Sequence, residues 1–474
     1  MRGVYSVEQI RAAEDALMAR QPDGALMARA AAGLAVECAR LLGRTYGARV
    51  VLLVGAGNNG GDALYAGAAL ARRGAAVRAL LLAPDRVHQG GLAALQRADG
   101  RVAPAAPESL SGADLVVDGI VGIGGQGALR GPAVELAAAA EAYPTVAVDV
   151  PSGVAAGTGE VAGPAVRADV TVTFGALKPG LVSGAGLAHV GELRLVDIGL
   201  DETLPPATTV VLEAADVAGL LPDPDESSDK YTRGAVGVAA GSPAYPGAGV
   251  LATGSAAVGG AGYVRYAGGA GDAIRARYPE VVVQSGADPE QLRVQSWVVG
   301  PGMGTDEDAH RLLAAVLATD VPVIVDADGI TLLGQHPELL RDRRAPTVLT
   351  PHDREFARIA DGPSADRLAS AQTAARQLGA TVLLKGAATI VAAPDGRAWI
   401  NPTGTPWLAT AGSGDVLSGL LGSLLAGGLE APLAAATAAY VHGVAGQLAA
   451  AGGPPSAVDV LEALRPALAA VRRG

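Results

Sequence analysis

Short apolar runs alternate with helical patterning along the first half of the chain. Runs rich in apolar and β-branched residues predict strands over residues 49–54, 77–82, 115–118, 145–150, 169–174 and 192–198. Apolar positions spaced three and four residues apart predict helices over residues 7–20, 25–42 and 61–73. Strands that alternate with helices form a parallel sheet covered on both faces, so this half predicts an α/β domain.

The second half repeats this alternation without sharing a register with the first. Strands are predicted over residues 235–239, 263–266, 281–284, 297–299, 321–326, 347–349, 381–384, 389–392 and 398–400. Helices are predicted over residues 249–260, 306–318, 354–359, 365–378 and 416–425. The segment 200–209 predicts a linker between the halves, and the acidic segment 222–229 is expected to be exposed.

Composition narrows the class of protein. Half of the 474 residues are hydrophobic but only 3% are aromatic, so the cores must be built from alanine, valine and leucine. The net charge of −11 disfavours nucleic-acid binding. Cys38 is the only cysteine, which excludes an intramolecular disulfide and a thiolate metal cluster. Because neither a signal peptide nor a membrane-spanning apolar run is evident, we expect a soluble, cytoplasmic protein with no membrane partner.

Lysine and asparagine are rare enough to be informative. The lysines are Lys178, Lys230 and Lys385, and the asparagines are Asn58, Asn59 and Asn401. Arginine occupies most basic positions, but it cannot imitate a compact ammonium. Chance would explain why any one of these lysines or asparagines is present. All six residues lie in or beside glycine-rich segments, which indicates that several of them serve chemistry.

A small-residue turn in the second half places a carboxylate where phosphate binds. Gly412, Ser413 and Gly414 precede Asp415, and the apolar run from Val416 predicts a helix. The free N–H groups and dipole of a helix N-terminus favour bound phosphate. An aspartate there is suited to handling the proton of a hydroxyl that attacks or leaves near the phosphate. The plain alternative is an N-capped helix after a glycine turn.

A second glycine-rich turn follows the first strong strand. Residues 55–62 read Gly-Ala-Gly-Asn-Asn-Gly-Gly-Asp and open a helix, where a doubly wound fold binds phosphate-bearing ligands. They lack the dinucleotide fingerprint, which disfavours a Rossmann dehydrogenase. Asn58 and Asn59 are suited either to coordinating a cation or to holding an amide-bearing ligand.

Two aspartates end apolar strands in the same half. Asp118 and Asp149 should face one crevice, because ligands bind at the carboxyl ends of parallel strands. Alternatively, each caps a turn or a helix. Residues 148–153, Val-Asp-Val-Pro-Ser-Gly, add the hydroxyl of Ser152, and residues 122–127, Gly-Ile-Gly-Gly-Gln-Gly, add a flexible loop.

These motifs, with Thr-Phe-Gly-Ala-Leu-Lys-Pro-Gly, resemble the NAD(P)H-hydrate epimerase domain in residues and order. The resemblance covers residues 1–205 and implies epimerisation at the hydrated ring carbon of the damaged cofactors NADHX and NADPHX. It implies hydrate contacts from Asn58, Asn59, Gly60, Gly61, Asp62, Gly122, Ile123, Gly124, Gly125, Gln126, Gly127, Ala128 and Asp149, with Asp149 as the catalytic candidate. It further implies potassium held near Asn59, Asp118 and Ser152, whose oxygens suit a hard cation. Lys178 is either structural or a phosphate partner.

Strand ends in the second half carry further candidate chemistry. Asp326 and Asp328 end one strand, and Val-Gly-Pro-Gly-Met-Gly at 299–304 ends another. His352 lies in a strand-end turn, Leu-Thr-Pro-His-Asp-Arg-Glu-Phe. Leu-Lys-Gly-Ala-Ala-Thr at 384–389 offers Lys385 to nucleotide phosphates.

Together these segments resemble the ADP/ATP-dependent NAD(P)H-hydrate dehydratase domain of the ribokinase-like superfamily, over residues 210–474. Arg354 stands where that family usually has glycine. The resemblance implies ADP as co-substrate, magnesium on the phosphates, and nucleotide contacts from Lys385, Gly386, Ala387, Ala388, Thr389, Gly412, Ser413 and Gly414. It implies hydrate contacts from Gly304, His352 and Asp415, with Asp415 catalytic.

The sequence therefore predicts two α/β domains in a bifunctional NAD(P)H-hydrate repair enzyme. A Rossmann-like three-layer α/β/α sandwich over residues 1–205 would epimerise the substrate. A ribokinase-like α/β/α domain over residues 210–474 would dehydrate the S epimer with ADP. Alternatives are a small-alcohol kinase of the hydroxymethylpyrimidine or thiazole type fused to a nucleotide-binding module, and a non-catalytic sensor of damaged cofactor. Domains of both kinds commonly associate, which favours a homo-oligomer.

Overall fold

The computed structural model describes residues 1–125 and 127–473, which form two compact units. One unit is Gly3–Ala207, and the other comprises Met1, Arg2 and the residues from Thr208 onward. In the second unit, the Arg2 guanidinium pairs with the Glu213 carboxylate at 2.7 Å. The first two residues therefore belong with the C-terminal unit rather than with the unit that follows them in sequence.

Parallel strands form the sheet of the N-terminal unit, in the order β4-β3-β2-β5-β6-β7-β8. The strands are β2 Arg49–Val54, β3 Ala76–Leu81, β4 Arg101–Ala103, β5 Leu115–Gly119, β6 Thr145–Val148, β7 Val170–Phe174 and β8 Glu192–Val196. Each predicted strand is present. The sequence missed β4, because this short edge strand is largely exposed and has no apolar run.

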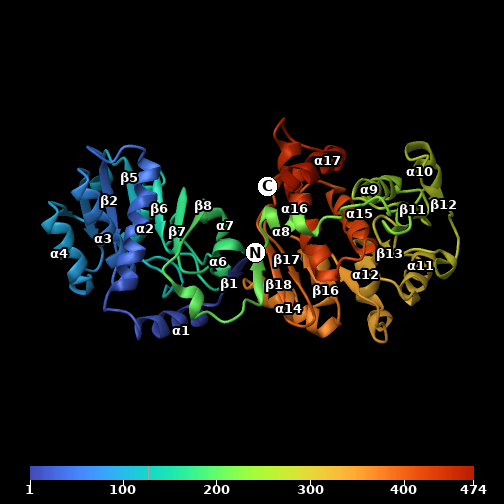
Figure 1. The fold of residues 1–474 in the computed structure, drawn as a ribbon, viewed down its shortest axis with the longest axis horizontal. Helices are drawn as coiled ribbons and strands as arrows, with labels where there is room; N and C mark the ends of the chain where they lie inside the picture. Colours follow the sequence, from blue (N-terminus) through green and yellow to red (C-terminus); the bar gives the residue numbers. More distant parts are fainter. Residues whose placement is uncertain (126, 474) are drawn as a thin grey trace. The chain divides into compact units, whose positions relative to one another are not determined.

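Helices cover both faces of this sheet and give it three layers (Figure 1). Val50, Leu52 and Val54 of β2 pack with residues of α1, α2 and α3, while Val51 and Leu53 pack with residues of α5. The helices are α1 Val7–Met18, α2 Ala25–Leu42, α3 Asn58–Arg72, α4 Gln89–Arg97, α5 Pro132–Ala140, α6 Pro179–Val182 and α7 Leu187–Val190. Helix α3 begins at Asn58, earlier than the predicted start at Gly61, so the polar motif forms its first turn.

The sheet of the C-terminal unit has the strand order β1-β9-β18-β17-β16-β15-β14-β13-β10-β11-β12. The strands are β1 Arg2–Val4, β9 Thr209–Val211, β10 Ala235–Ala239, β11 Tyr263–Tyr266, β12 Val282–Val283, β13 Ser296–Val299, β14 Val323–Val325, β15 Thr347–Leu349, β16 Thr381–Leu384, β17 Thr389–Ala392 and β18 Ala398–Asn401. Most neighbours are parallel, but β16, β17 and β18 pair antiparallel. Their connections are too short for a crossover helix, so the chain must turn back on itself.

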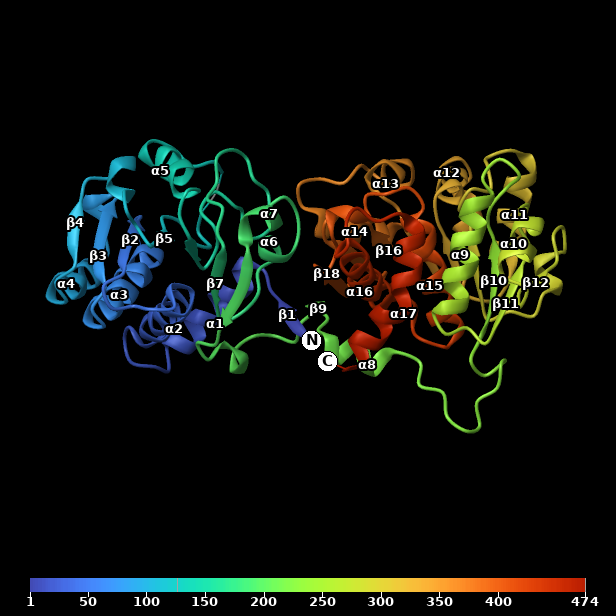
Figure 2. The same ribbon diagram turned by 90° about the horizontal axis from the view of Figure 1, so that it is seen from above.

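Helices also flank this second sheet on both faces (Figure 2). Val236 and Val298 pack with residues of α9, α15 and α16, whereas Trp297 and Val299 pack with residues of α11 and α12. The helices are α8 Ala214–Leu220, α9 Pro246–Val258, α10 Gly271–Arg277, α11 Glu307–Ala318, α12 Asp328–Gln335, α13 Asp353–Ile359, α14 Arg367–Leu378, α15 Ser413–Ala426, α16 Ala431–Ala450 and α17 Ala457–Arg473. No helix in the described ranges is long and apolar enough to cross a membrane.

Short 3₁₀ helices supplement these elements. They are η1 Pro84–Arg86, η2 Pro107–Leu110, η3 Leu200–Glu202, η4 Pro289–Gln291, η5 Pro337–Leu340 and η6 Pro406–Leu408. Both ends of the expected linker are structured, because Leu200 is buried in the N-terminal core and Thr209 is the first residue of β9. The segment without regular structure between the units is therefore shorter than the sequence indicated.

Candidate functional site

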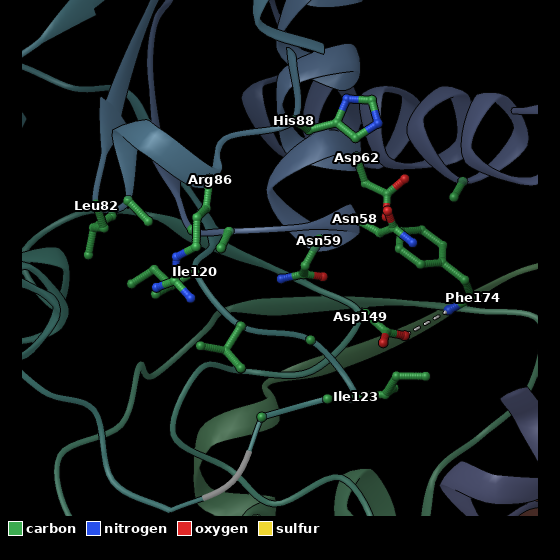
Figure 3. Close-up of a pocket in the computed structure, with 18 of the residues that line it drawn as sticks. Asn58, Asn59, Asp62, Leu82, Arg86, His88, Ile120, Ile123, Asp149 and Phe174 are labelled. Atoms are coloured by element: carbon green, nitrogen blue, oxygen red, sulfur yellow. Dashed lines mark hydrogen bonds between the residues drawn. The ribbon is translucent and has the colours of Figure 1, made fainter. Parts of the chain in front are cut away.

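The N-terminal unit contains a cavity of about 1150 Å³ (Figure 3). Its lining comes from the first turn of α3, the loop after β5, the loop after β6 and the inner face of α1. The predicted hydrate-binding residues that line it are Asn58, Asn59, Asp62, Gly122, Ile123, Gly124, Gly125, Gly127, Ala128 and Asp149. Gln126 lies outside the described residues. The carboxyl ends of the strands thus converge on one crevice, but of the two strand-end aspartates predicted to face it, only Asp149 lines it.

Gly60 and Gly61 do not line this cavity. A Cβ on Gly60 would lie 2.4 Å from the Gly55 carbonyl oxygen, and a Cβ on Gly61 would lie 2.9 Å from the His88 ring. Both glycines therefore permit α3 to approach the neighbouring backbone and ring closely. They shape the wall of the cavity instead of contacting its contents.

The Asn59 side chain connects the loop after β5 to the end of β6. Its amide, oriented to satisfy both neighbours, donates to the Val148 carbonyl at 3.1 Å and accepts from the Gly122 N–H at 3.3 Å. A Cβ on Gly122 would lie 2.8 Å from the side-chain amide of Asn59. Glycine is therefore required where the loop after β5 crosses this amide.

Asp118 is fully buried behind the cavity and does not line it. Its Oδ1 accepts from the Ser152 hydroxyl at 2.7 Å, and its Oδ2 accepts from the Ser152 N–H at 2.8 Å. The Ile120 N–H also donates to Oδ1, at 3.2 Å. Burial raises the pKa of Asp118 to about 6 despite these bonds. In the described part of the chain, no basic side chain pairs with this carboxylate.

Asp149 lines the cavity in an unusual backbone conformation, with a φ of 68°. Its Oδ1 accepts from the Lys178 ammonium at 2.6 Å and from the Thr173 hydroxyl at 3.2 Å. Lys178 is only 1% exposed and also donates to Thr173 Oγ1 and to the Phe174 carbonyl. Of the two roles left open for Lys178, the structure supports the structural one. The strained backbone is held by this buried ion pair.

Sequence reasoning missed several residues of the cavity. Arg11 and Glu14 come from α1, Arg86 from η1, and His88 from the cap of α4. Burial raises the pKa of Glu14, and the nearby Asp149 raises it further. No local motif marks these positions, because the tertiary placement of α1 and α4 alone brings them to the strand ends.

The second candidate site lies at the N-terminus of α15. The helix begins at Ser413, and Gly412 precedes it with a φ of 91°. The predicted start at Val416 was wrong, so Asp415 lies inside the first helical turn rather than before it. In the described part of the chain, the Gly414 and Asp415 N–H groups have no partner and remain available to an anion, whereas the Ser413 N–H donates to the Thr410 carbonyl at 3.3 Å.

A network of charges faces Asp415. The Lys385 ammonium donates to Asp326 Oδ1 at 2.8 Å and lies 3.7 Å from Glu355 Oε2. The Ser418 hydroxyl of α15 donates to Asp326 Oδ2 at 2.7 Å. A Cβ on Gly414 would lie 3.3 Å from the Lys385 Nζ, which brings this lysine to the helix N-terminus. The sequence predicted that Lys385 binds nucleotide phosphates, but it did not predict the carboxylates that pair with this lysine.

Asp415 resists ionisation in this setting. Burial is the main cause, the neighbouring Asp326 adds to it, and Lys385 opposes it; the resulting pKa is about 7. At neutral pH this group is therefore near the midpoint of its titration, where a group can both accept and return a proton.

The remaining hydrate-contact candidates lie on two strand-end turns. The Gly304 N–H donates to Asp328 Oδ2 at 2.9 Å. His352 caps α13, its Nδ1 accepting the Glu355 N–H at 3.2 Å while Glu355 Oε2 accepts the His352 N–H at 2.9 Å. Arg354, the departure from the family pattern, is an exposed residue in the first turn of α13 and leaves this capping box intact.

The predicted nucleotide-binding loop, residues 385–389, contacts its neighbours through its backbone carbonyl groups. Arg367 donates to the Lys385 carbonyl at 2.9 Å, and a Cβ on Gly404 would lie 2.8 Å from the Ala387 carbonyl oxygen. Gly386, Ala388 and Thr389 continue this turn into β17. His442 of α16, which the sequence did not single out, is buried nearby, and burial lowers its pKa to about 4.

Known proteins share both halves of this arrangement. A family model described as NAD(P)H-hydrate dehydratase matches residues 236–464, and one described as YjeF-related protein N-terminus matches residues 23–180. The bifunctional NAD(P)H-hydrate repair enzyme Nnr of Mycobacterium tuberculosis (strain H37Rv) is 52% identical over 410 residues, covering 85% of this chain and 84% of that protein. Its Mycobacterium leprae (strain TN) counterpart is 51% identical over 484 residues, covering 99% of this chain and 100% of that protein.

Solved structures match the C-terminal unit. The ADP/ATP-dependent NAD(P)H-hydrate dehydratase from Bacillus subtilis, co-crystallised with ATP and Mg²⁺, has a TM-score of 0.50 and 28% identity, and covers 55% of this chain and 98% of its own. A ribokinase-like superfamily protein from Enterococcus faecalis V583 has a TM-score of 0.52 and 26% identity, and covers 57% and 99%. The predicted ribokinase-like fold is confirmed. With a relative more than half identical over most of both chains, the protein belongs to the family of bifunctional NAD(P)H-hydrate repair enzymes.

Proposed function

We propose that the C-terminal unit dehydrates the S epimers of NADHX and NADPHX with ADP, and that the N-terminal unit interconverts the R and S epimers. The observation that carries the proposal is the placement of Asp415 in the first turn of α15, beside Lys385 and Asp326. This combines a phosphate-binding helix end with one titratable carboxylate, as activation of a hydroxyl by phosphorylation requires.

In the dehydratase reaction, Asp415 takes the proton of the substrate hydroxyl as that oxygen receives a phosphoryl group from ADP. AMP is released, and phosphate then leaves with the oxygen because it is a far better leaving group than water. Loss of a proton from the neighbouring ring carbon forms the double bond of NAD(P)H. The N–H groups of Gly414 and Asp415 and the Lys385 ammonium stabilise charge on the transferring phosphoryl group. Magnesium would neutralise charge on the nucleotide phosphates, and the carboxylates of Asp326 and Glu355 beside Lys385 are the groups that would hold it.

The dehydratase rate should rise with pH through about 7. The reason is that Asp415 acts as a base, and its pKa of about 7 means that the competent, ionised form accumulates only above that pH. Initial rates of NADH formation from purified S-NADHX at saturating ADP, measured across this range, would show the rise and a plateau on the alkaline side. A flat profile across neutral pH would contradict the assignment of Asp415 as the titrating base.

For the epimerase unit, we propose that potassium binds at Asn59, Asp118 and Ser152. The support is that Asp118 is a fully buried carboxylate without a basic partner among the described residues, so a monovalent cation beside it would offset the cost of burying its charge. Carboxylate, amide and hydroxyl oxygens are suitable ligands for such an ion. The cation would hold together the loops after β5 and β6 that line the cavity.

Asp118→Asn should remove the potassium dependence of epimerisation. We expect wild-type activity to fall when potassium is replaced by a large organic cation, and the variant to be slow and insensitive to the exchange. Epimer exchange would be followed by chromatography of R- and S-NADHX. A variant that still responds to potassium like the wild type would place the ion elsewhere.

The function is tested by absorbance at 340 nm after the protein is mixed with R- and S-NADHX, ADP, magnesium and potassium. Recovery of NADH from both epimers would establish both activities. Recovery of the S fraction alone would refute the epimerase. A phosphorylated product without NADH would support the small-alcohol kinase alternative.

A further inference from the structure

Among the described residues that line the cavity of the N-terminal unit, Asp62 alone has a buried carboxyl oxygen with no partner. Asp62 of α3 is 8% exposed, and its Oδ1 makes no hydrogen bond in the described part of the chain. The same side chain lines the cavity, and Figure 3 shows it among the labelled residues with Asn58 and Asp149. A buried polar atom without a partner is costly, which indicates that a ligand in the cavity completes its bonding.

The surroundings of Asp62 keep it protonated. Its burial raises its pKa to about 8, with further contributions from Asp149 and Glu14. Besides Asp62, the charged and titratable groups that line the cavity are Arg11, Glu14, Asp15, Arg86, His88, Arg130 and Asp149, and Lys178 lies behind Asp149. Lys178 is engaged by Asp149 at 2.6 Å, so it does not neutralise Asp62. At neutral pH, Asp62 therefore presents an acidic O–H to the cavity.

We propose that Asp62 is the general acid and base of the epimerase site, an assignment that rests on the proposed function. Asp62 donates its proton to the ring hydroxyl of the hydrate, and the C–O bond breaks to release water. The ring nitrogen supplies its lone pair to the same carbon, which leaves a cationic iminium. The ring turns about its bond to the ribose so that its opposite face meets Asp62, water adds to that face, and the Asp62 carboxylate accepts the proton that this water gives up. Every atom and charge is restored, and only the configuration has changed.

Charge distribution favours this route. The intermediate is a cation formed in a cavity lined by four carboxyl groups, those of Glu14, Asp15, Asp62 and Asp149. Asp149 is fixed by Lys178 and Thr173, so it is suited to stabilising the cation rather than to moving a proton. Two carboxyl groups in one site thus take different roles because their environments differ.

The test uses Asp62→Asn in the full chain, because asparagine matches the shape and keeps an N–H but cannot transfer a proton. We expect R-to-S exchange to slow by about 100-fold or more, with little change in KM. Dehydration of purified S-NADHX by the other unit of the same molecule should be unchanged and confirms that the variant is intact. Asp85→Asn, which removes an exposed carboxylate of η1, is the matched control and should exchange epimers at the wild-type rate.

A wild-type pH profile tests the proposal without a variant. Exchange should be constant below about pH 8 and decline above it, as Asp62 loses its proton, and in water enriched in oxygen-18 each exchange should introduce label at the ring hydroxyl. Asp62→Asn at the wild-type rate, or exchange without label, would overturn the role of Asp62. Absence of exchange in the wild-type protein would instead overturn the epimerase function itself.

Discussion

Asp415→Asn should lower the dehydratase kcat by about 100- to 10,000-fold, because the variant keeps the shape of the site but loses its proton acceptor. Binding of ADP should change little, since the donors of the α15 N-terminus and Lys385 remain in place. The measurement is NADH formation from S-NADHX at saturating ADP, with nucleotide affinity determined separately by titration.

Two controls distinguish loss of chemistry from loss of structure. Epimer exchange, catalysed by the N-terminal unit, should be unchanged in Asp415→Asn. The variant should also melt no earlier than the wild type above pH 7, because the folded protein resists ionising Asp415 and asparagine removes that cost. Turnover near the wild-type value would exclude Asp415 as the base.

Lys178→Met should destabilise the N-terminal unit by about 3–5 kcal/mol, the range for breaking a buried ion pair by removing one partner. The ammonium is almost fully buried, and its loss would leave the Asp149 carboxylate without its cation at 2.6 Å. Epimerase activity should fall with it, because the conformation of Asp149 depends on this contact.

The positions of the tryptophans allow the unfolding of the C-terminal unit to be followed separately. Trp297, Trp399 and Trp407 all belong to the C-terminal unit. In urea, circular dichroism should therefore show an earlier transition for Lys178→Met, while the tryptophan fluorescence transition stays where it is in the wild type. The double variant Lys178→Met/Asp149→Asn should recover part of the loss, because no charge is then buried alone. Equal stability of Lys178→Met and wild type would contradict the structural role of the pair.

The class of fold could be predicted from the sequence because its central strands, such as β5 and β14, are buried and consist mostly of apolar residues. Helix α16 was missed for a related reason. It is alanine-rich and buried on most sides, so it has no polar face to give a helical period. The antiparallel β16–β17–β18 segment was also not predicted, since strand direction depends on connection length rather than on the residues within each strand.

The site residues that belong to short sequence motifs could be predicted, whereas those that only the tertiary fold brings together could not. Asp118 and Asp149 both end strands, but only the structure shows that Asp118 turns inward to Ser152 while Asp149 reaches the cavity. Glu14 carries no motif, because its importance comes from where α1 packs. The pairing of Lys385 with Asp326 joins residues far apart in sequence, at the ends of strands β14 and β16.

The division of the chain into two units, each with its own core, has a consequence for dosage. A single round of translation delivers one copy of each catalyst, so their ratio is fixed at synthesis and cannot drift with differential expression or turnover. Any imbalance between the two reactions must then come from their intrinsic rates. Selection on flux would act on the slower unit alone, until the other becomes limiting.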